Sequence, residues 1–204
     1  MGPTFEFERA AMAEGFARIA GVDEVGRGPL AGPVTAAAVV LDPMRIPDGL
    51  NDSKKLTAKA RQRLYREIMQ VADVSIAHAS VEEIDALNIL RASHLAMTRA
   101  LDGLKTLGRP ADYALIDGNQ RPRDMTLPAR TIIKGDGRSQ SIAAASIMAK
   151  ICRDCVMLSL AQQHPGYGWE TNMGYGSKSH ILALQKLGPT PHHRRSFKPV
   201  HNML

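Results

Sequence analysis

The chain has 204 residues, 44% of them hydrophobic, and a formal net charge of +6, which fits one substantial domain with an anionic partner. No apolar run approaches the roughly 18 residues of a membrane span, and the acidic Glu6 and Glu8 argue against a secretory signal. We therefore expect a cytoplasmic protein that does not enter a membrane. Its two cysteines, Cys152 and Cys155, lie in an apolar helical pattern that favours reduced thiols over a metal or redox pair.

The spacing of apolar residues predicts strands and helices along the whole chain. In chain order, we expect strands over residues 18–25, 34–41, 73–80, 113–116 and 130–134, and helices from residue 57, over 81–107 with a break near Asn88, over 139–163 and over 177–187. Glycine and proline punctuate residues 26–33, which predicts a loop between the first two strands. Strands that come early and then alternate with helices predict an α/β domain built on a mixed sheet.

Three acids, Asp23, Asp117 and Asp136, each occur where an apolar strand meets a glycine. In open α/β sheets such strand ends line the crevice in which ligands bind. Carboxylates gathered there repel one another unless cations neutralise them, and Mg²⁺ prefers oxygen ligands. The alternative is that these acids only form turns, since Asp-Gly is a common turn pair. The pattern alone leaves both interpretations open.

Glu24 directly follows Asp23, and consecutive side chains on a regular strand point to opposite faces. Both carboxylates reach one site only if the strand ends or twists there, and Gly26 gives the backbone that freedom. Alternatively, Glu24 contributes its carbonyl oxygen or acts through water.

Residues 21–34, Gly-Val-Asp-Glu-Val-Gly-Arg-Gly-Pro-Leu-Ala-Gly-Pro-Val, resemble the signature of the ribonuclease HII family. The resemblance extends over about residues 19–200, because further blocks match in the same order. These blocks are Asp52-Ser53-Lys54-Lys55-Leu56, Ile116-Asp117-Gly118-Asn119, Lys134-Gly135-Asp136, residues 141–147, Ala149-Lys150, Arg153-Asp154, residues 165–168, residues 174–176 and residues 193–197.

The resemblance implies a ribonuclease H-like α/β fold, with a mixed five-stranded sheet flanked by helices and a small C-terminal helical region. We expect a single catalytic domain over residues 1–204, with a core over about 16–160 and a C-terminal helical segment over about 161–204. The implied activity is hydrolysis of the RNA strand of RNA–DNA hybrids, and cutting on the 5′ side of single ribonucleotides embedded in duplex DNA. The cut leaves a 5′-phosphate and a 3′-hydroxyl. A monomer is expected, and the sequence names no protein partner.

By the same resemblance, four acids hold two Mg²⁺ or Mn²⁺ ions: Asp23, Glu24, Asp117 and Asp136. Asp154 is left as the structural partner of a nearby base. Several further residues resemble substrate-binding positions. Gly26, Arg27 and Gly28 would sense the ribonucleotide 2′-hydroxyl, and Tyr175 would stack on the sugar at the RNA–DNA junction. Lys54 would lie near the scissile phosphate, while Arg194 and Arg195 would contact phosphates. The 2′-hydroxyl is what distinguishes RNA from DNA at one position. Plain alternatives exist: a packed or surface tyrosine, a solvated lysine, and arginines that only add solubility.

Three other classes compete with this interpretation. Ribonuclease HIII shares the Asp-Glu start, but it has an extra N-terminal domain, and only about 18 residues precede the first strand here. Its fourth acid lies four residues beyond the third, where this chain has Arg121. A Holliday-junction resolvase would not explain the Gly-Arg-Gly turn or Tyr175. A non-catalytic hybrid-binding protein would not need all four acids.

Overall fold

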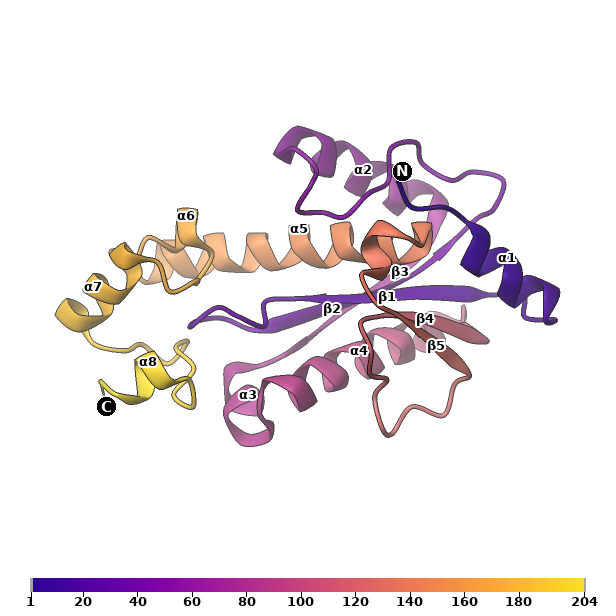
Figure 1. Cartoon of the computed structure of the whole chain (residues 1–204). Coiled ribbons are helices and arrows are strands. Elements are labelled where there is room, and N and C mark those ends of the chain that lie inside the picture. Colours follow the sequence, from indigo (N-terminus) through magenta and orange to yellow (C-terminus); the bar gives the residue numbers. More distant parts are fainter. Residues whose placement is uncertain (1, 204) are drawn as a thin grey trace.

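A five-stranded mixed sheet forms the centre of the protein, as predicted (Figure 1). The structure is a computed structural model that describes residues 2–203. The strands are β1 (Ile19–Val25), β2 (Val34–Leu41), β3 (Ala72–Ala79), β4 (Tyr113–Asp117) and β5 (Ala129–Ile132), in the order β3-β2-β1-β4-β5. The three strands β1, β2 and β3 pair antiparallel, whereas β4 lies parallel to both β1 and β5. The strand predicted over 130–134 ends earlier, at Ile132, because Lys134 adopts a left-handed conformation.

The helices in chain order are α1 (Glu6–Ala13), α2 (Ala58–Val71), α3 (Val81–Leu87), α4 (Ile89–Thr106), α5 (Gln140–Gln163), α6 (Trp169–Asn172), α7 (Lys178–Leu187) and α8 (Lys198–His201), with a short 3₁₀ turn, η1, over Gly135–Gly137. The predicted break near Asn88 is confirmed: its φ of 71° ends α3, and its side chain accepts hydrogen bonds from the first N–H groups of α4. The three short helices α1, α6 and α8 were not predicted. Within residues 2–203, no helix has both the length and the apolar character needed to cross a membrane.

Helices cover both faces of the sheet, and β2 shows how its residues divide between them. Ala37 and Val39 pack in a core with α2 and α5, whereas Ala36 and Ala38 pack in a second core with α4. Because strand side chains alternate in direction, neighbouring residues of β2 serve opposite layers. The whole strand is therefore buried, which explains its continuous apolar sequence.

The first turn of α5 lies directly against the backbone of β1. A Cβ atom on Gly21 would collide with the main chain of Ser141. Only glycine permits this approach, and the run Ala143–Ala145 continues the close packing further along α5. Helix α5 therefore has a set position along β1.

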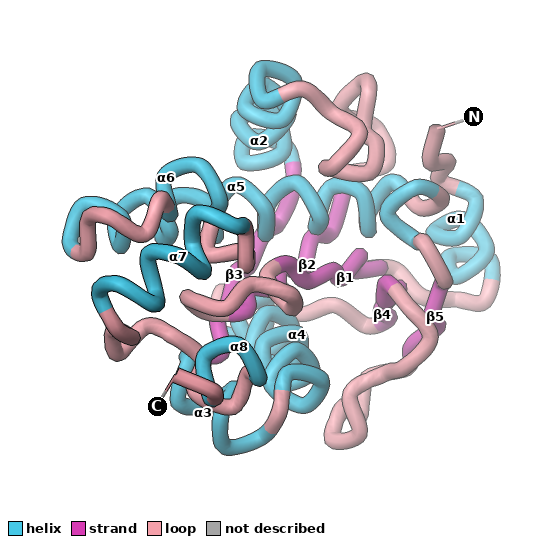
Figure 2. The backbone as a smooth tube through the Cα atoms, turned by 60° about the vertical axis from the view of Figure 1, so that its left-hand side comes forward, coloured by secondary structure: helices cyan, strands magenta, loops and turns pink. Residues whose placement is uncertain are grey.

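The C-terminal helices gather around the loop between β1 and β2, which reaches out of the sheet between α7 and α8 (Figures 1 and 2). Leu30 and Ala31 of this loop share an apolar cluster with Trp169 and Leu184. The main chain also joins the two regions, because the N–H of Arg194 donates to the carbonyl of Leu30 at 2.8 Å. The C-terminal region is thus packed onto the loop.

Two buried histidines hold this region together in their neutral form. His180 accepts a hydrogen bond from the indole N–H of Trp169 at 3.0 Å, and its Nε2 lies 3.1 Å from Nε2 of His193. Nδ1 of His193 accepts from the main-chain N–H of Thr190 at 3.0 Å. Burial, and then the neighbouring His180, lower the pKa of His193 to about 4. The pKa of His180 is lowered by burial as well.

We predict that the protein loses stability as the pH falls from about 6.5 to about 4. A histidine whose pKa is lower in the folded state binds its proton more readily after unfolding, so its contribution is complete above pH 6.5 and is lost below it. The loss from His193 is on the order of 3 kcal/mol. Thermal unfolding between pH 4 and 8 should show a shallower slope for His193→Asn than for the wild type. The exposed His201 provides the control, and an equal slope in His193→Asn would contradict the prediction.

Candidate active site

Two of the predicted acids, Asp23 and Asp117, are carried by neighbouring parallel strands. The last pair between β1 and β4 is Val22 with Ile116, and each acid is the next residue of its strand. β1 itself continues to Val25 alongside β2. The strand predicted over residues 18–25 is thus confirmed, and only its pairing with β4 stops before Asp23. The two carboxylates consequently lie at the same edge of the parallel part of the sheet.

Asp136 reaches the same edge from η1, the short turn that joins β5 to α5. The main-chain N–H of Gly135 donates to Oδ1 of Asp117 at 2.6 Å, which ties this turn to the end of β4. Burial raises the pKa of Asp136, and the charges of Asp52 and Asp117 raise it further, while Lys54 lowers it. Asp136 is thus affected by the charges of Asp52, Asp117 and Lys54.

Glu24 belongs to the same group, although it follows Asp23 on a continuous strand. Its side chain is only 11% exposed, and Nη1 of Arg27 donates to its Oε1 at 3.3 Å. Burial raises the pKa of Glu24, the cation of Arg27 lowers it, and the charge of Asp117 raises it again. Two adjacent residues of one strand thus both interact with the acid at the end of β4.

The four carboxylates carry more negative charge than their surroundings neutralise. Asp23 is 6% exposed, and burial raises its pKa well above 3.8, with further increases from Glu24, Asp117 and Asp136. Its hydrogen bond comes from the main-chain N–H of Glu24 at 2.7 Å, and none of the ion pairs within residues 2–203 includes it. Clustered oxygen donors of this kind suit hard divalent cations.

The carboxylates are not closed around a common point. Within the described residues, no three histidine, cysteine, aspartate or glutamate side chains are close enough to hold one ion together. Repulsion among like charges opposes such closure until a cation offsets it. The donor chemistry of the site therefore fits divalent cations.

The predicted sensor residues meet at the loop between β1 and β2. Gly26 has a φ of 95°, and a Cβ there would collide with the side chain of Arg153. Gly28 is exposed and faces the ring of Tyr175: a Cβ on it would lie 3.4 Å from that ring. Tyr175 itself is 45% exposed. Residues from the two ends of the chain are thereby brought onto one surface.

Arg194 and Arg195 are neighbours in sequence but have opposite environments. Arg194 is fully buried, and its guanidinium donates to the carbonyls of Gly26, Arg27, Gly32 and Pro33. The expectation that Arg194 contacts phosphate was wrong, because these carbonyls surround its donors inside the protein. Arg195 is exposed, while its main-chain N–H donates to Asp85 at 3.0 Å.

One participant in this region, Arg153, was missed. It is 1% exposed and donates to the carbonyls of Ala31, Pro33 and Met173. A charged residue within the apolar pattern of a helix was the available signal. The next residue, Asp154, pairs with Lys150 at 2.7 Å, which confirms the structural partnership that was expected. Cys152 and Cys155 are free thiols on α5, also as expected.

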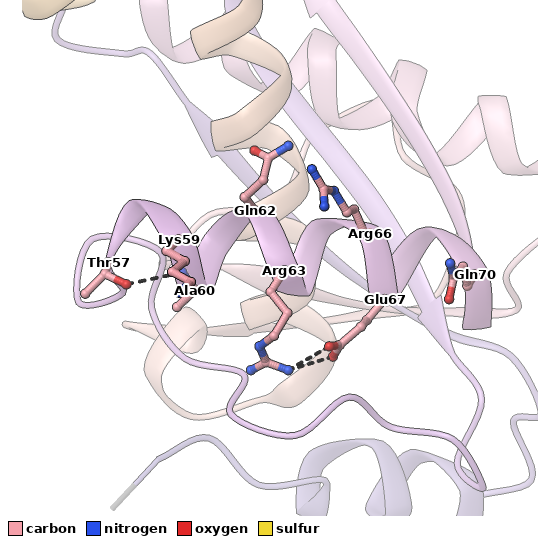
Figure 3. A pocket seen from close by; sticks show the side chains of 8 residues that line it. All are labelled: Thr57, Lys59, Ala60, Gln62, Arg63, Arg66, Glu67 and Gln70. Atoms are coloured by element: carbon pink, nitrogen blue, oxygen red, sulfur yellow. Dashed lines mark hydrogen bonds and ion pairs between the residues drawn. The ribbon is translucent and has the colours of Figure 1, made fainter.

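A hollow of about 760 Å³ lies apart from the acids, along α2 (Figure 3). Its lining is Thr57, Lys59, Ala60, Gln62, Arg63, Arg66, Glu67 and Gln70. Arg63 bonds to Glu67 at 2.7 Å across one turn of the helix. The hollow includes none of the predicted site residues, so its position does not define the active site.

Comparison with known proteins links this chain to one family. A family model described as Ribonuclease HII matches residues 20–200. A Ribonuclease HII of Cereibacter sphaeroides is 67% identical over 202 residues, which cover 99% of this chain and 94% of that protein. The ribonuclease H2 structure from Pyrococcus horikoshii has a TM-score of 0.73 at 25% identity, covering 92% of this chain and 97% of that one. Bst-RNase HIII in complex with Mn²⁺ shares the fold, with a TM-score of 0.76 at 19% identity over 95% of this chain and 71% of that one.

We predict that Asp23→Asn stabilises the protein in EDTA at neutral pH. An acid whose pKa is higher in the folded state than its unfolded value of 3.8 lowers stability as the pH rises above that value. The amide removes this cost, and each kcal/mol corresponds to about 2–4 °C in Tm. At pH values where Asp23 is protonated in both states, the advantage should disappear. Mn²⁺ should raise the Tm of the wild type more than that of Asp23→Asn, and an equal rise in both would count against this site.

Proposed function

The chain belongs to the ribonuclease HII family, and on that premise we propose that it also cuts duplex DNA on the 5′ side of a single embedded ribonucleotide. As a member of this family it is an endonuclease of the ribonuclease H type, and such enzymes act on RNA–DNA hybrids. The observation that carries the proposal is the joint presence of four acids at one sheet edge and the Gly26–Gly28 turn facing Tyr175.

The family is metal-dependent, and we propose Asp23, Glu24, Asp117 and Asp136 as the ligands of two Mg²⁺ or Mn²⁺ ions. The proposal is supported by the surplus negative charge of these carboxylates and by the Mn²⁺ complex of the structurally similar Bst-RNase HIII. Such a pair of ions activates water for attack and stabilises the leaving oxygen. Cleavage leaves a 5′-phosphate on one fragment and a 3′-hydroxyl on the other.

Residues around the acids have complementary tasks. Lys54, exposed beside Asp136, is positioned to offset the charge that develops on the scissile phosphate. Arg195 is exposed and contacts a more distant phosphate in this proposal. The net charge of +6 favours binding of the duplex backbone in general.

Selection of the ribonucleotide is assigned to the turn formed by Gly26, Arg27 and Gly28, with Tyr175. Because Gly28 has no side chain, the main chain can approach a sugar closely. The main-chain polar groups of the turn then form hydrogen bonds with the 2′-hydroxyl. The exposed ring of Tyr175 stacks on the sugar of the next nucleotide at the RNA–DNA junction.

The competing classes fare differently. The family match excludes the resolvase interpretation. It also favours the HII over the HIII family, because the likeness to Bst-RNase HIII, at 19% identity, is one of fold alone. A non-catalytic binding protein of the same family is distinguished by the cleavage assay below. A monomer, a cytoplasmic location and a single domain over residues 1–204 stay predictions.

We predict that Asp117→Asn folds normally but nearly abolishes cleavage. The amide oxygen can still accept the 2.6 Å hydrogen bond from Gly135, so the turn keeps its anchor. The lost ligand charge should cost several kcal/mol of transition-state stabilisation. Cleavage of an RNA–DNA hybrid with Mg²⁺ or Mn²⁺ is measured on gels, with Asp124→Asn as the control because Asp124 is exposed outside the site. Activity of Asp117→Asn within about tenfold of the wild type would refute the ligand assignment.

We predict that one ribonucleotide in duplex DNA is a sufficient substrate and stays on the 5′ end of the downstream fragment. Tyr175→Phe should cost little, whereas Tyr175→Ala should lose roughly 1–3 kcal/mol, as expected for a stacking partner. Gly28→Ala places a methyl group against Tyr175 and should impair cleavage of this duplex more than binding of all-DNA duplex. Gel mapping of the products gives the cut position. Cutting on the 3′ side, or equal cutting of all-DNA duplex, is incompatible with the proposal.

A further inference from the structure

Two buried arginines, Arg153 and Arg194, form the underside of the loop between β1 and β2. Neither forms an ion pair with an acid within residues 2–203. Their donors are instead occupied by main-chain carbonyls, and the two arginines approach the loop from α5 and from the segment before α8. The carbonyls that they bind within the loop belong to Gly26, Arg27, Ala31, Gly32 and Pro33.

Burying two like charges close together is unfavourable without a compensating acid. Burial lowers the pKa of Arg153 to about 10 and, together with the charge of Arg153, lowers that of Arg194 to about 9. Main-chain carbonyls accept their hydrogen bonds, and the guanidinium of Arg194 also lies 5.1 Å from the centroid of the Phe197 ring. A neutral side chain could fill this space with a smaller desolvation cost, so we expect a role of the two charged groups other than packing.

The hydrogen bonds of Arg194 determine which way the peptide groups of the sensor turn face. Its Nη2 donates to the carbonyl of Gly26 at 2.6 Å, and its Nη1 donates to that of Arg27 at 3.0 Å. Within residues 2–203 every peptide bond is trans, so each N–H points opposite to the carbonyl of its peptide group. With both carbonyls turned inward, the N–H groups of Arg27 and Gly28 are directed outward.

These two N–H groups lie where a ligand can reach them. Arg27 and Gly28 are exposed, whereas Gly26 is buried. Neither N–H donates to an acceptor within residues 2–203. Gly28 lies next to the ring of Tyr175, so this part of the turn faces the region assigned to the sugar. An oxygen acceptor from outside the protein would satisfy both.

We propose that Arg194, supported by Arg153, is a positioning residue that aims the N–H groups of Arg27 and Gly28 at the ribonucleotide 2′-hydroxyl. The inference rests on the proposed reading of that hydroxyl by the turn. Arg194 acts from beneath and touches no substrate. Arg153 has a lesser effect, because its acceptors, Ala31 and Pro33, lie beyond the turn.

The first test compares two affinities in EDTA, where no divalent cation supports cleavage. We measure the Kd of wild type and Arg194→Lys for a duplex with one ribonucleotide and for the same all-DNA duplex. Lysine keeps the charge but lacks the planar fork that binds two carbonyls. Losing two aligned hydrogen bonds should reduce the preference for the ribonucleotide about tenfold, while the all-DNA affinity stays the same.

Arg18→Lys is the matched control. Arg18 also binds main-chain carbonyls, those of Arg109 and Pro110, but it directly precedes β1, at the end of that strand far from the turn. Its replacement should leave the preference intact. An undiminished preference in Arg194→Lys overturns the inference, and so does an equal loss of both affinities, which indicates a structural role only. A wild type without any preference refutes the proposed reading itself, which separates the two failures.

A second test uses only the wild type, so it can be carried out even if Arg194→Lys does not fold. The amide NMR signals of Arg27 and Gly28 should shift when the single-ribonucleotide duplex is added, and shift less with the all-DNA duplex. Equal shifts with both duplexes overturn the inference, because the two N–H groups would then not respond to the hydroxyl.

Discussion

The contact between Gly21 and Ser141 is the constraint on which the site depends, because it fixes β1, which carries Asp23 and Glu24, against the start of α5, which follows the turn that carries Asp136. β1 bears Asp23 two residues after Gly21, and α5 begins four residues after Asp136. Main chain against main chain leaves no adjustable side chain between them. The buried Glu8 of α1 reinforces this corner by accepting hydrogen bonds from the hydroxyl of Ser139 and the N–H of Ser141. This packed corner thus ties the main chain near Asp23 to the main chain near Asp136.

Within the part of the chain that the structure describes, the two buried arginines form no ion pair with the four acids around this frame. The acids occupy the sheet edge, where burial and mutual repulsion raise the pKa of Asp23 and Asp136. Buried cations lie instead under the neighbouring loop, held by carbonyls. If Arg153 or Arg194 paired with the acids, it would neutralise the charge that is proposed to attract divalent ions. Because the two arginines bind neutral carbonyls instead, the acids keep their charge and the arginines keep supporting the loop.

Much of the fold could be predicted because it depends on local signals. The continuous apolar run of β2, the break at Asn88 and the long α5 follow from apolar spacing and turn chemistry. Asp23, Asp117 and Asp136 attracted notice because each occurs where an apolar strand meets a glycine, whereas the four-acid site with Glu24 was implied by the resemblance. Arg194 was misjudged because two adjacent arginines look alike in sequence, while burial is decided by a loop more than 160 positions away. The short helices α1, α6 and α8 were not predicted, because one or two helical turns are too short to show a periodic spacing of apolar residues.

The dependence of the turn on Arg194 also sets an order of events during synthesis. Residues 26–33 leave the ribosome early, and the arginine that gathers their carbonyls follows at the end of the chain. Contacts between such distant residues form late in folding. A chain interrupted before residue 194 already contains all four acids but has an unsupported turn. The proposed reading of the 2′-hydroxyl is therefore complete only once residue 194 has been synthesised and has packed under the turn.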